Sequence, residues 1–394
     1  MSETRAKGPL PIYIAKGARV YVSGLLSLAI PFYLDTLGYS LLFQGIALSA
    51  ILGGGAVSNL ALTYFDRRIS RRRTLQLFSL LMMASGIVFA YSTSPLPLLA
   101  ACLIGNISTT GTEAGPFQSV EAGVLPDLVP TKGAVRAFGK YNLIGYTAAA
   151  AGALTAVALG LSGGDPGAYK LLFIGFALVG VLLFVLYGML GEMGGRGSAR
   201  PGLGSLSPKA RRDVFVLSGL FSVDAFGGTF VSQYLLSTWF RIAYGLPLES
   251  LGVIFAVAQV VSAGSTYAAA IVAERLGNLR TMVYTHILSN LFLVSIALSG
   301  SLPFSLGFFF LRQSFSQMDV PTRQALMSEM FVSEERVVAY AITNTVRTGG
   351  AFSGGPVAAG LLALGLVSGL IYTAGITKTA YDIAIYSVYG KKYR

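Results

Sequence analysis

The stretch LLFQGIALSAILGGGAVSNLALTYFDRRISRRRTL, residues 41–75, decides the fold class. Its apolar part, Leu41–Phe65, contains no charged side chain. It is long enough to cross a bilayer as a helix, which takes about 20 residues. The part that follows, Asp66–Leu75, is rich in arginine. Because basic residues stay on the cytoplasmic side of a membrane, the stretch predicts a transmembrane helix that ends in a short cytoplasmic loop.

The whole chain shares this composition. Of its 394 residues, 54% are hydrophobic and 12% are charged. A soluble domain carries about 25% charged residues, so too little charge is present to cover a water-facing surface. We therefore predict an all-α integral membrane protein. The net charge of +12 is typical of basic cytoplasmic loops, and we expect no nucleic acid as a partner.

Residue counts exclude several classes of function. Cys102 is the single cysteine and His286 the single histidine, which excludes a disulfide framework and a His-Glu-x-x-His metal site. The sequence contains no Walker-type lysine loop and no Gly-x-Gly-x-x-Gly turn between a strand and a helix. We expect no enzyme activity, no metal site and no cofactor.

Continuous apolar runs predict twelve transmembrane helices. These are Ala18–Leu34, Leu41–Phe65, Thr74–Tyr91, Leu96–Val124, Ala137–Leu161, Tyr169–Leu190, Asp213–Phe240, Leu251–Val272, Thr281–Leu298, Pro303–Met330, Val337–Leu362 and Val367–Tyr389. The first run lacks a small-residue cleavage site, so we expect it to remain in the protein. Lys and Arg gather at one set of helix ends, whereas the opposite loops hold Lys170 and Arg241. This asymmetry predicts a multi-pass protein of the cell membrane with both termini in the cytoplasm. We expect a monomer in contact with membrane lipids.

A basic segment rich in Gly and Ser, residues 191–212, has the composition of a linker. It separates an N-terminal half, residues 1–190, from a C-terminal half, residues 213–394. The halves repeat each other: Asp66–Leu75 after span 2 corresponds to Glu274–Met282 after span 8. Repeated halves around a central site are the plan of secondary transporters.

This layout, with an acid–Arg loop after spans 2 and 8, resembles the major facilitator superfamily over essentially the whole chain. The resemblance implies twelve helices in two pseudo-symmetric six-helix halves and transport by alternating access. It also implies a conformational latch formed by the residues that match the family's loop motif, namely Asp66, Arg67, Glu274, Arg275, Gly277 and Arg280. The first copy of the motif departs from the family, because Ser70 stands where glycine is usual and one residue is inserted.

Polar residues inside the spans indicate the site, since an ionisable group at the centre of a bilayer costs about 2.5–3.5 kcal/mol and needs a partner. In span 4 a continuous helix would place one polar stripe on a single face: Asn106, Thr110, Glu113, Phe117 and Glu121. Pro116 should break or bend that helix. In span 10, Arg312, Asp319 and Arg323 would likewise share a face.

We interpret part of this set, together with Arg347 of span 11, as a solute site consisting of Asn106, Thr110, Glu113, Phe117, Arg312, Asp319 and Arg347. Proton coupling is assigned to Glu113, Asp224 and Asp319, because burial gives a carboxyl group the raised pKa that proton exchange requires. The competing interpretation is structural, with acids and bases neutralising each other inside the bundle, and Arg347 in particular is expected to neutralise Asp319 or Asp224.

Four other polar residues of the spans are predicted to have structural roles. Lys378 and Asp382 are four residues apart on span 12 and are expected to pair within that helix. Arg19 is expected to anchor span 1 at the interface, and His286 to be a satisfied buried histidine.

The predicted function is secondary active transport of a small solute by alternating access, coupled to protons. Two alternatives stay open: a proton-driven multidrug efflux antiporter, and transfer of a lipid or lysolipid between leaflets. The acidic and basic residues of the spans are about equal in number, which favours internal pairing over a strongly anion-selective cavity.

Overall fold

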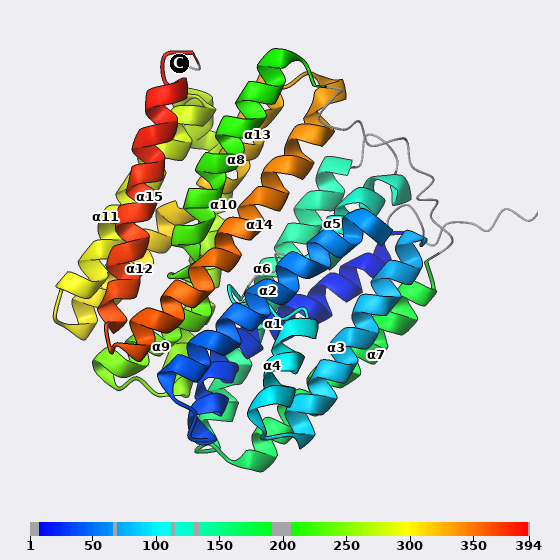
Figure 1. Cartoon of the computed structure of the whole chain (residues 1–394), viewed down its shortest axis with the longest axis vertical. Coiled ribbons are helices and arrows are strands. Elements are labelled where there is room, and N and C mark those ends of the chain that lie inside the picture. Colours follow the sequence, from blue (N-terminus) through cyan, green and yellow to red (C-terminus); the bar gives the residue numbers. More distant parts are fainter. Residues whose placement is uncertain (1–7, 66–68, 112–114, 130–133, 191–205, 393–394) are drawn as a thin grey trace, which may run out of the picture. The chain divides into compact units, whose positions relative to one another are not determined.

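A computed structural model describes residues 8–65, 69–111, 115–129, 134–190 and 206–392 of the chain. These residues form helices and connecting segments, without a strand (Figure 1). The first helices are α1 (Leu10–Thr36), α2 (Leu41–Phe65), α3 (Arg71–Tyr91), α4 (Pro95–Ile104), α5 (Pro116–Val124), a short 3-10 helix η1 (Leu125–Leu128), α6 (Ala134–Leu161) and α7 (Pro166–Gly188). The others are α8 (Pro208–Thr229), α9 (Gln233–Tyr244), α10 (Leu248–Leu276), α11 (Asn278–Leu298), α12 (Leu302–Ser316), α13 (Asp319–Met330), α14 (Ser333–Ala363) and α15 (Val367–Tyr389).

The predicted helical architecture is confirmed, and every predicted span coincides with one helix or with two consecutive helices. Spans 4, 7 and 10 are each divided in two, as α4 with α5, α8 with α9, and α12 with α13. Eight helices in the described part of the chain are long and apolar enough to cross a membrane. Large apolar side chains remain exposed along them, for example Leu171, Leu178 and Val185 on α7. Such an apolar surface suits lipid and not water.

The chain divides into two compact units, Met1–Ser198 with Gly245–Ala256, and Ala199–Tyr244 with Val257–Arg394. In the first unit, α1 packs against α6, and α3 against α7. In the second unit, α8 packs against α14, and α11 against α15. Counted as spans, the first unit pairs span 1 with span 5 and span 3 with span 6. The second unit pairs the corresponding spans, namely span 7 with span 11 and span 9 with span 12. The internal repeat read from the loops is therefore present in the helix packing as well.

Glycines allow neighbouring helices of each unit to approach closely. Gly54 of α2 lies against the backbone of Leu103 on α4, so that a Cβ added to Gly54 would overlap the Leu103 carbonyl oxygen. In the second unit, Gly350 of α14 faces the backbone of Ser222 on α8 in the same way. Small residues at helix contacts are the usual means of close packing in membranes. The glycine-rich stretches of spans 2 and 11 thus have a packing role.

The interruption that Pro116 predicts in span 4 is a complete break between two helices. Helix α4 ends at Ile104, Asn106 adopts a left-handed backbone conformation with φ of 49°, and Gly111 follows with φ of 71°. Pro116 is the first residue of α5 and not a bend inside a helix. Proline suits this first position because the N–H it lacks would have no helical partner there. The polar stripe predicted along one helical face therefore does not exist, and Glu113 lies outside the described residues.

Span 10 is interrupted just before its proline. Helix α12 ends at Ser316 and α13 begins at Asp319, with a turn at Gln317 and Met318. A proline ring clashes with the carbonyl group four residues earlier, which for Pro321 is that of Gln317. Arg312 therefore lies on α12 and the pair Asp319 and Arg323 on α13, on either side of this turn.

The contact between α2 and α4 can be tested with two neighbouring glycines. Gly54→Ala should destabilise the protein by about 1–3 kcal/mol, because the new methyl group overpacks the contact with Leu103. Gly55→Ala is the matched control, since a Cβ at Gly55 meets nothing within 4 Å. Its expected effect is neutral or slightly stabilising, because alanine favours helix more than glycine does. Thermal unfolding in detergent measures both, and equal melting temperatures would contradict the assigned contact.

Candidate functional site

Asp224 of α8 is the centre of a group of buried charges in the second unit. Its Oδ1 accepts a hydrogen bond from Lys378 Nζ of α15 at 2.6 Å, and its Oδ2 lies 3.4 Å from Arg323 Nη1 of α13. All three residues are buried. Arg323 also pairs with Asp319, one turn earlier on α13, at 3.2 Å. Asp224 therefore joins three helices through two cations.

His286 of α11 extends this group. Its Nδ1 lies 2.8 Å from Asp382 Oδ1 of α15, and its Nε2 lies 3.3 Å from Lys378 Nζ. Asn290 Nδ2 donates to the second oxygen of Asp382 at 2.9 Å, and Asp382 is fully buried. Asp224, His286, Asp319, Arg323, Lys378 and Asp382 are called the buried charge cluster below. Its members come from α8, α11, α13 and α15.

The cluster corrects one prediction. Lys378 and Asp382 do not pair within span 12, because Lys378 reaches Asp224 on α8 whereas Asp382 faces His286 and Asn290 on α11. His286 is indeed buried and satisfied, but it is also the link between the two carboxylates. No sequence signal could have revealed that link, because residues 286 and 290 lie on α11 and residues 378 and 382 on α15, which are far apart in the chain.

Arg312 of α12 stands outside the cluster. Its Nη1 donates to Gln313 Oε1 at 2.5 Å, and its Nε is buried without a hydrogen-bond partner. The side chain is nearly enclosed, with a residue exposure of 8%, and it has no carboxylate within ion-pair distance among the described residues. Gln313 in turn donates to Ser262 Oγ of α10 at 3.2 Å and accepts from Ser316. Arg312 is thus a buried cation among neutral polar groups.

Arg347 of α14 lies close to the buried charge cluster. It makes no ion pair within the described part of the chain, and its Nε is also buried without a partner. It is close enough to Asp224, Asp319 and Arg323 for their charges to act on it. With Arg323 and Lys378 it supplies three positive charges beside the three carboxylates of the cluster.

The first unit contains a separate buried ion pair. Arg19 Nη1 and Nη2 of α1 donate to the two oxygens of Glu121 on α5, at 2.8 and 2.6 Å. The hydroxyl groups of Tyr141 and Tyr187 donate to the same carboxylate at 2.8 and 2.7 Å. Arg19 is 3% exposed and Glu121 is 0% exposed, so the prediction that Arg19 anchors the interface is wrong. A bidentate Arg–carboxylate pair is the geometry that offsets burial best.

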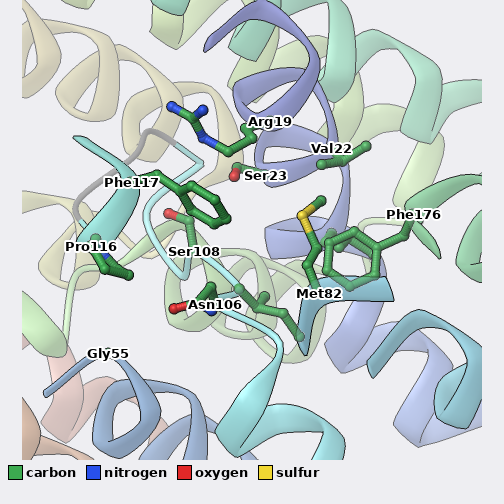
Figure 2. Close-up of a pocket in the computed structure, with 13 residues that line it drawn as sticks. Arg19, Val22, Ser23, Gly55, Met82, Asn106, Ser108, Pro116, Phe117 and Phe176 are labelled. Carbon is green, nitrogen blue, oxygen red and sulfur yellow. The ribbon is translucent and has the colours of Figure 1, made fainter. Parts of the chain in front are cut away.

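Beside this pair lies a small pocket of the first unit, shown in Figure 2. Arg19, Ser23, Asn106, Ser108 and Phe117 are among the residues that line it. Its volume of about 30 Å³ has room for about two water molecules. The Oδ1 atom of Asn106 is buried without a hydrogen-bond partner.

The pocket brings together only some of the predicted solute-site residues of span 4. Asn106 and Phe117 meet at it, on either side of the break between α4 and α5. Thr110 is exposed and contacts Ser108.

The loop that would form the latch is described in its second copy only. Gly277 separates α10 from α11 with φ of 81°, a conformation that favours glycine. Glu274 and Arg275 are exposed, and within the described residues neither they nor Arg280 form an ion pair. Asp66 and Arg67 lie outside the described residues.

Residues 12–355 match the family model of the Major Facilitator Superfamily. The chain belongs to this family. It is therefore a multi-pass membrane protein and a secondary transporter, as the sequence indicated.

Known relatives fit this assignment. An uncharacterized membrane protein of Saccharomyces cerevisiae, YJR124C, is 25% identical over 383 residues, which cover 88% of this chain and 85% of that protein. Among solved structures, the peptide-transporter-family protein PepTSo superposes with a TM-score of 0.77 at 11% identity, covering 98% of this chain and 99% of that one. A D-xylose–proton symporter gives 0.73 at 15% identity, covering 98% of both chains. At these identities the solved structures show a common fold and no common substrate.

The Arg19–Glu121 pair yields a stability prediction. Glu121→Gln removes the negative charge and leaves Arg19 buried beside a neutral group, which should cost about 3–5 kcal/mol. Glu274→Gln is the control, because Glu274 is exposed and its replacement should change stability by less than about 0.5 kcal/mol. Thermal unfolding of both variants in detergent checks this. Equal stability of the two variants would mean that the pair does not hold α1 to α5.

Proposed function

We propose that this transporter carries a small solute with an anionic group, and that it couples this transport to protons by alternating access. The observation that carries the proposal is Arg312. A cation that is buried in a membrane protein is costly unless it is paired. The carboxylates of the buried charge cluster already have partners in Arg323, Lys378, His286 and Asn290, so none is left over for Arg312.

The surroundings of Arg312 support an anionic ligand. A guanidinium group presents five N–H donors in a planar fork that matches a carboxylate or a phosphate group. Gln313 and Ser316 lie beside it on α12 and Ser262 lies across on α10, so amide and hydroxyl groups can complete the hydrogen bonds of a small polar solute. The solute residues proposed from the sequence, Asn106, Thr110, Glu113, Phe117, Asp319 and Arg347, remain candidates for its other contacts.

Proton coupling follows from the charge of the solute. Moving one negative charge across a membrane potential of 100 mV changes the free energy by about 2.3 kcal/mol, and a proton that travels with the anion cancels this term. Glu113, Asp224 and Asp319 are the proposed proton-coupling carboxylates. One structural neighbour is a proton symporter, for D-xylose, so the fold is compatible with such coupling.

The remaining assignments from the sequence become part of this proposal. The protein would lie in the cell membrane as a monomer, with both termini in the cytoplasm. The two halves, residues 1–190 and 213–394, would alternate in opening to either side. Asp66, Arg67, Glu274, Arg275, Gly277 and Arg280 would form the latch of that motion.

A ligand screen by thermal shift tests the solute class. Purified protein is heated with small carboxylates, phosphate esters, sugars, amino acids, lipophilic cations or lysolipids. A ligand at 100 times its Kd should add roughly 2.7 kcal/mol of apparent stability. We expect hits among the carboxylates or phosphate esters, lost in Arg312→Gln and retained in the control Arg212→Gln, which removes an exposed arginine of α8.

Other outcomes of this screen are equally informative. Hits confined to lipophilic cations would favour drug efflux, and hits confined to lysolipids would favour lipid transfer. Either result would contradict an anionic solute. A carboxylate or phosphate ester that still stabilises Arg312→Gln would remove Arg312 from the site while keeping the solute class.

Proton coupling is tested with the same solute in proteoliposomes. An imposed pH difference should drive its accumulation by the wild-type protein, and a protonophore should abolish it. Asp224→Asn and Glu113→Gln are the variants, and Asp35→Asn is the control, since Asp35 is an exposed carboxylate at the end of α1. If both variants still accumulate the solute in response to pH, then neither carboxylate carries the proton.

A further inference from the structure

The hydrogen bonds of His286 select one form of its ring. Nδ1 faces the carboxylate of Asp382, which accepts a proton, and Nε2 faces the ammonium group of Lys378, which donates one. A neutral imidazole satisfies both neighbours only if Nδ1 carries the hydrogen and Nε2 carries the lone pair. The opposite tautomer would direct an N–H at an ammonium group and a lone pair at a carboxylate. The geometry therefore assigns a neutral imidazole with its proton on Nδ1.

Adding a proton to Nε2 disrupts this arrangement. The hydrogen bond from Lys378 is lost, and two positive groups then stand about 3.3 Å apart. Asp224 Oδ1 lies 2.6 Å from Lys378 Nζ and 3.7 Å from His286 Nε2, so the imidazolium and the ammonium group compete for the same oxygen. Protonation of the ring thereby weakens the hold of Lys378 on Asp224, and with it the contact of α15 with α8, whereas the bond from Nδ1 to Asp382 gains charge and keeps α15 on α11.

The groups around the ring leave no second acceptor for that proton. Helix α15 presents Asp382, Lys378 and the ring of Tyr381, whose centroid lies 6.0 Å from that of the imidazole. Helix α8 presents Asp224, and α13 presents Arg323, which already pairs with Asp224. Helix α12 packs on α11 through the rings of Phe308 and Phe315. Asp224 is thus the only carboxylate that a proton on Nε2 can reach among the described residues.

We infer that His286 Nε2 is the proton-binding site of the second unit, and that a proton bound there releases Lys378 from its place between His286 and Asp224. This deepens the proposed function, since it names the group through which the proton acts on Asp224. Histidine suits the task because its charge changes between about pH 5 and 8, where the proton gradients of cells operate. His286 would act without touching the solute.

The single histidine permits a direct test that needs no solute. Protein labelled with ¹⁵N-histidine, with any affinity tag removed, gives the signals of one imidazole ring in NMR spectra. At pH 8 we expect the neutral tautomer with hydrogen on Nδ1, and towards pH 5 conversion to the imidazolium. A ring that is protonated on Nε2 at pH 8, or that stays neutral down to pH 5, would overturn the inference.

The mechanical consequence is tested by hydrogen exchange. After correction for intrinsic rates, exchange in α8 and α15 of the wild type should rise several-fold from pH 8 to pH 5. His286→Gln is the key variant, since its amide can donate to Asp382 and accept from Lys378 but cannot be protonated in this range. It should keep the exchange of the pH 8 wild type at both pH values. An equal rise in wild type and variant would contradict the proposed release of Lys378 by protonation of His286.

These measurements separate the two proposals. The ligand screen can find no anionic solute while His286 becomes protonated and exchange in α15 rises. In that case the proposed solute is wrong and the proposed proton site at His286 stands. If the screen succeeds and the ring does not titrate, the solute assignment stands and the proton acts elsewhere.

Discussion

The attraction between Asp224 and its two cations is the interaction on which the second unit depends. A carboxylate in the interior of a membrane protein cannot rely on water, so its stability comes from fixed partners. Lys378 and Arg323 supply them from two other helices, and His286 carries the connection on to Asp382. Helices α8, α11, α13 and α15 are therefore held together by polar contacts in addition to the packing of Leu217, Phe221 and Tyr381 in the same unit.

The bilayer made much of this fold predictable from sequence. A helix that spans it needs a long apolar run, so the ends of α2 and α15 could be read directly from the hydrophobicity of residues 41–65 and 367–389. The loops that contain Asp66 and Glu274 follow spans 2 and 8, and their acid–Arg motif indicated the family. The breaks in spans 4 and 10 were less accessible. Proline marks them, but it does not say whether a helix bends at Pro116 or begins there.

The partners of the buried charges could not be predicted. Spacing along one helix suggested that Lys378 would choose Asp382, yet each side chain turned to a different neighbouring helix. Arg19 was misplaced because its position near a span end allows two solutions, snorkelling to water or pairing inside, and only the position of Glu121 decides between them. Such choices depend on which helices touch, and that information is not local. Arg312 was identified correctly as buried, but its lack of a partner is visible only once the other charges are paired.

The two ion pairs show a likeness of the halves that residue identity does not. Arg19 lies on span 1 and Glu121 on span 4, whereas Asp224 lies on span 7 and Arg323 on span 10, the corresponding helices of the second half. In each half an ion pair thus connects the first helix to the fourth, with the signs in opposite order. Glu121 stands five residues after Pro116 and Arg323 two residues after Pro321, so the two pairs use different positions of the repeat. A comparison of the halves by residue identity would miss this likeness, whereas a comparison by complementary charge on the first and fourth helices would detect it.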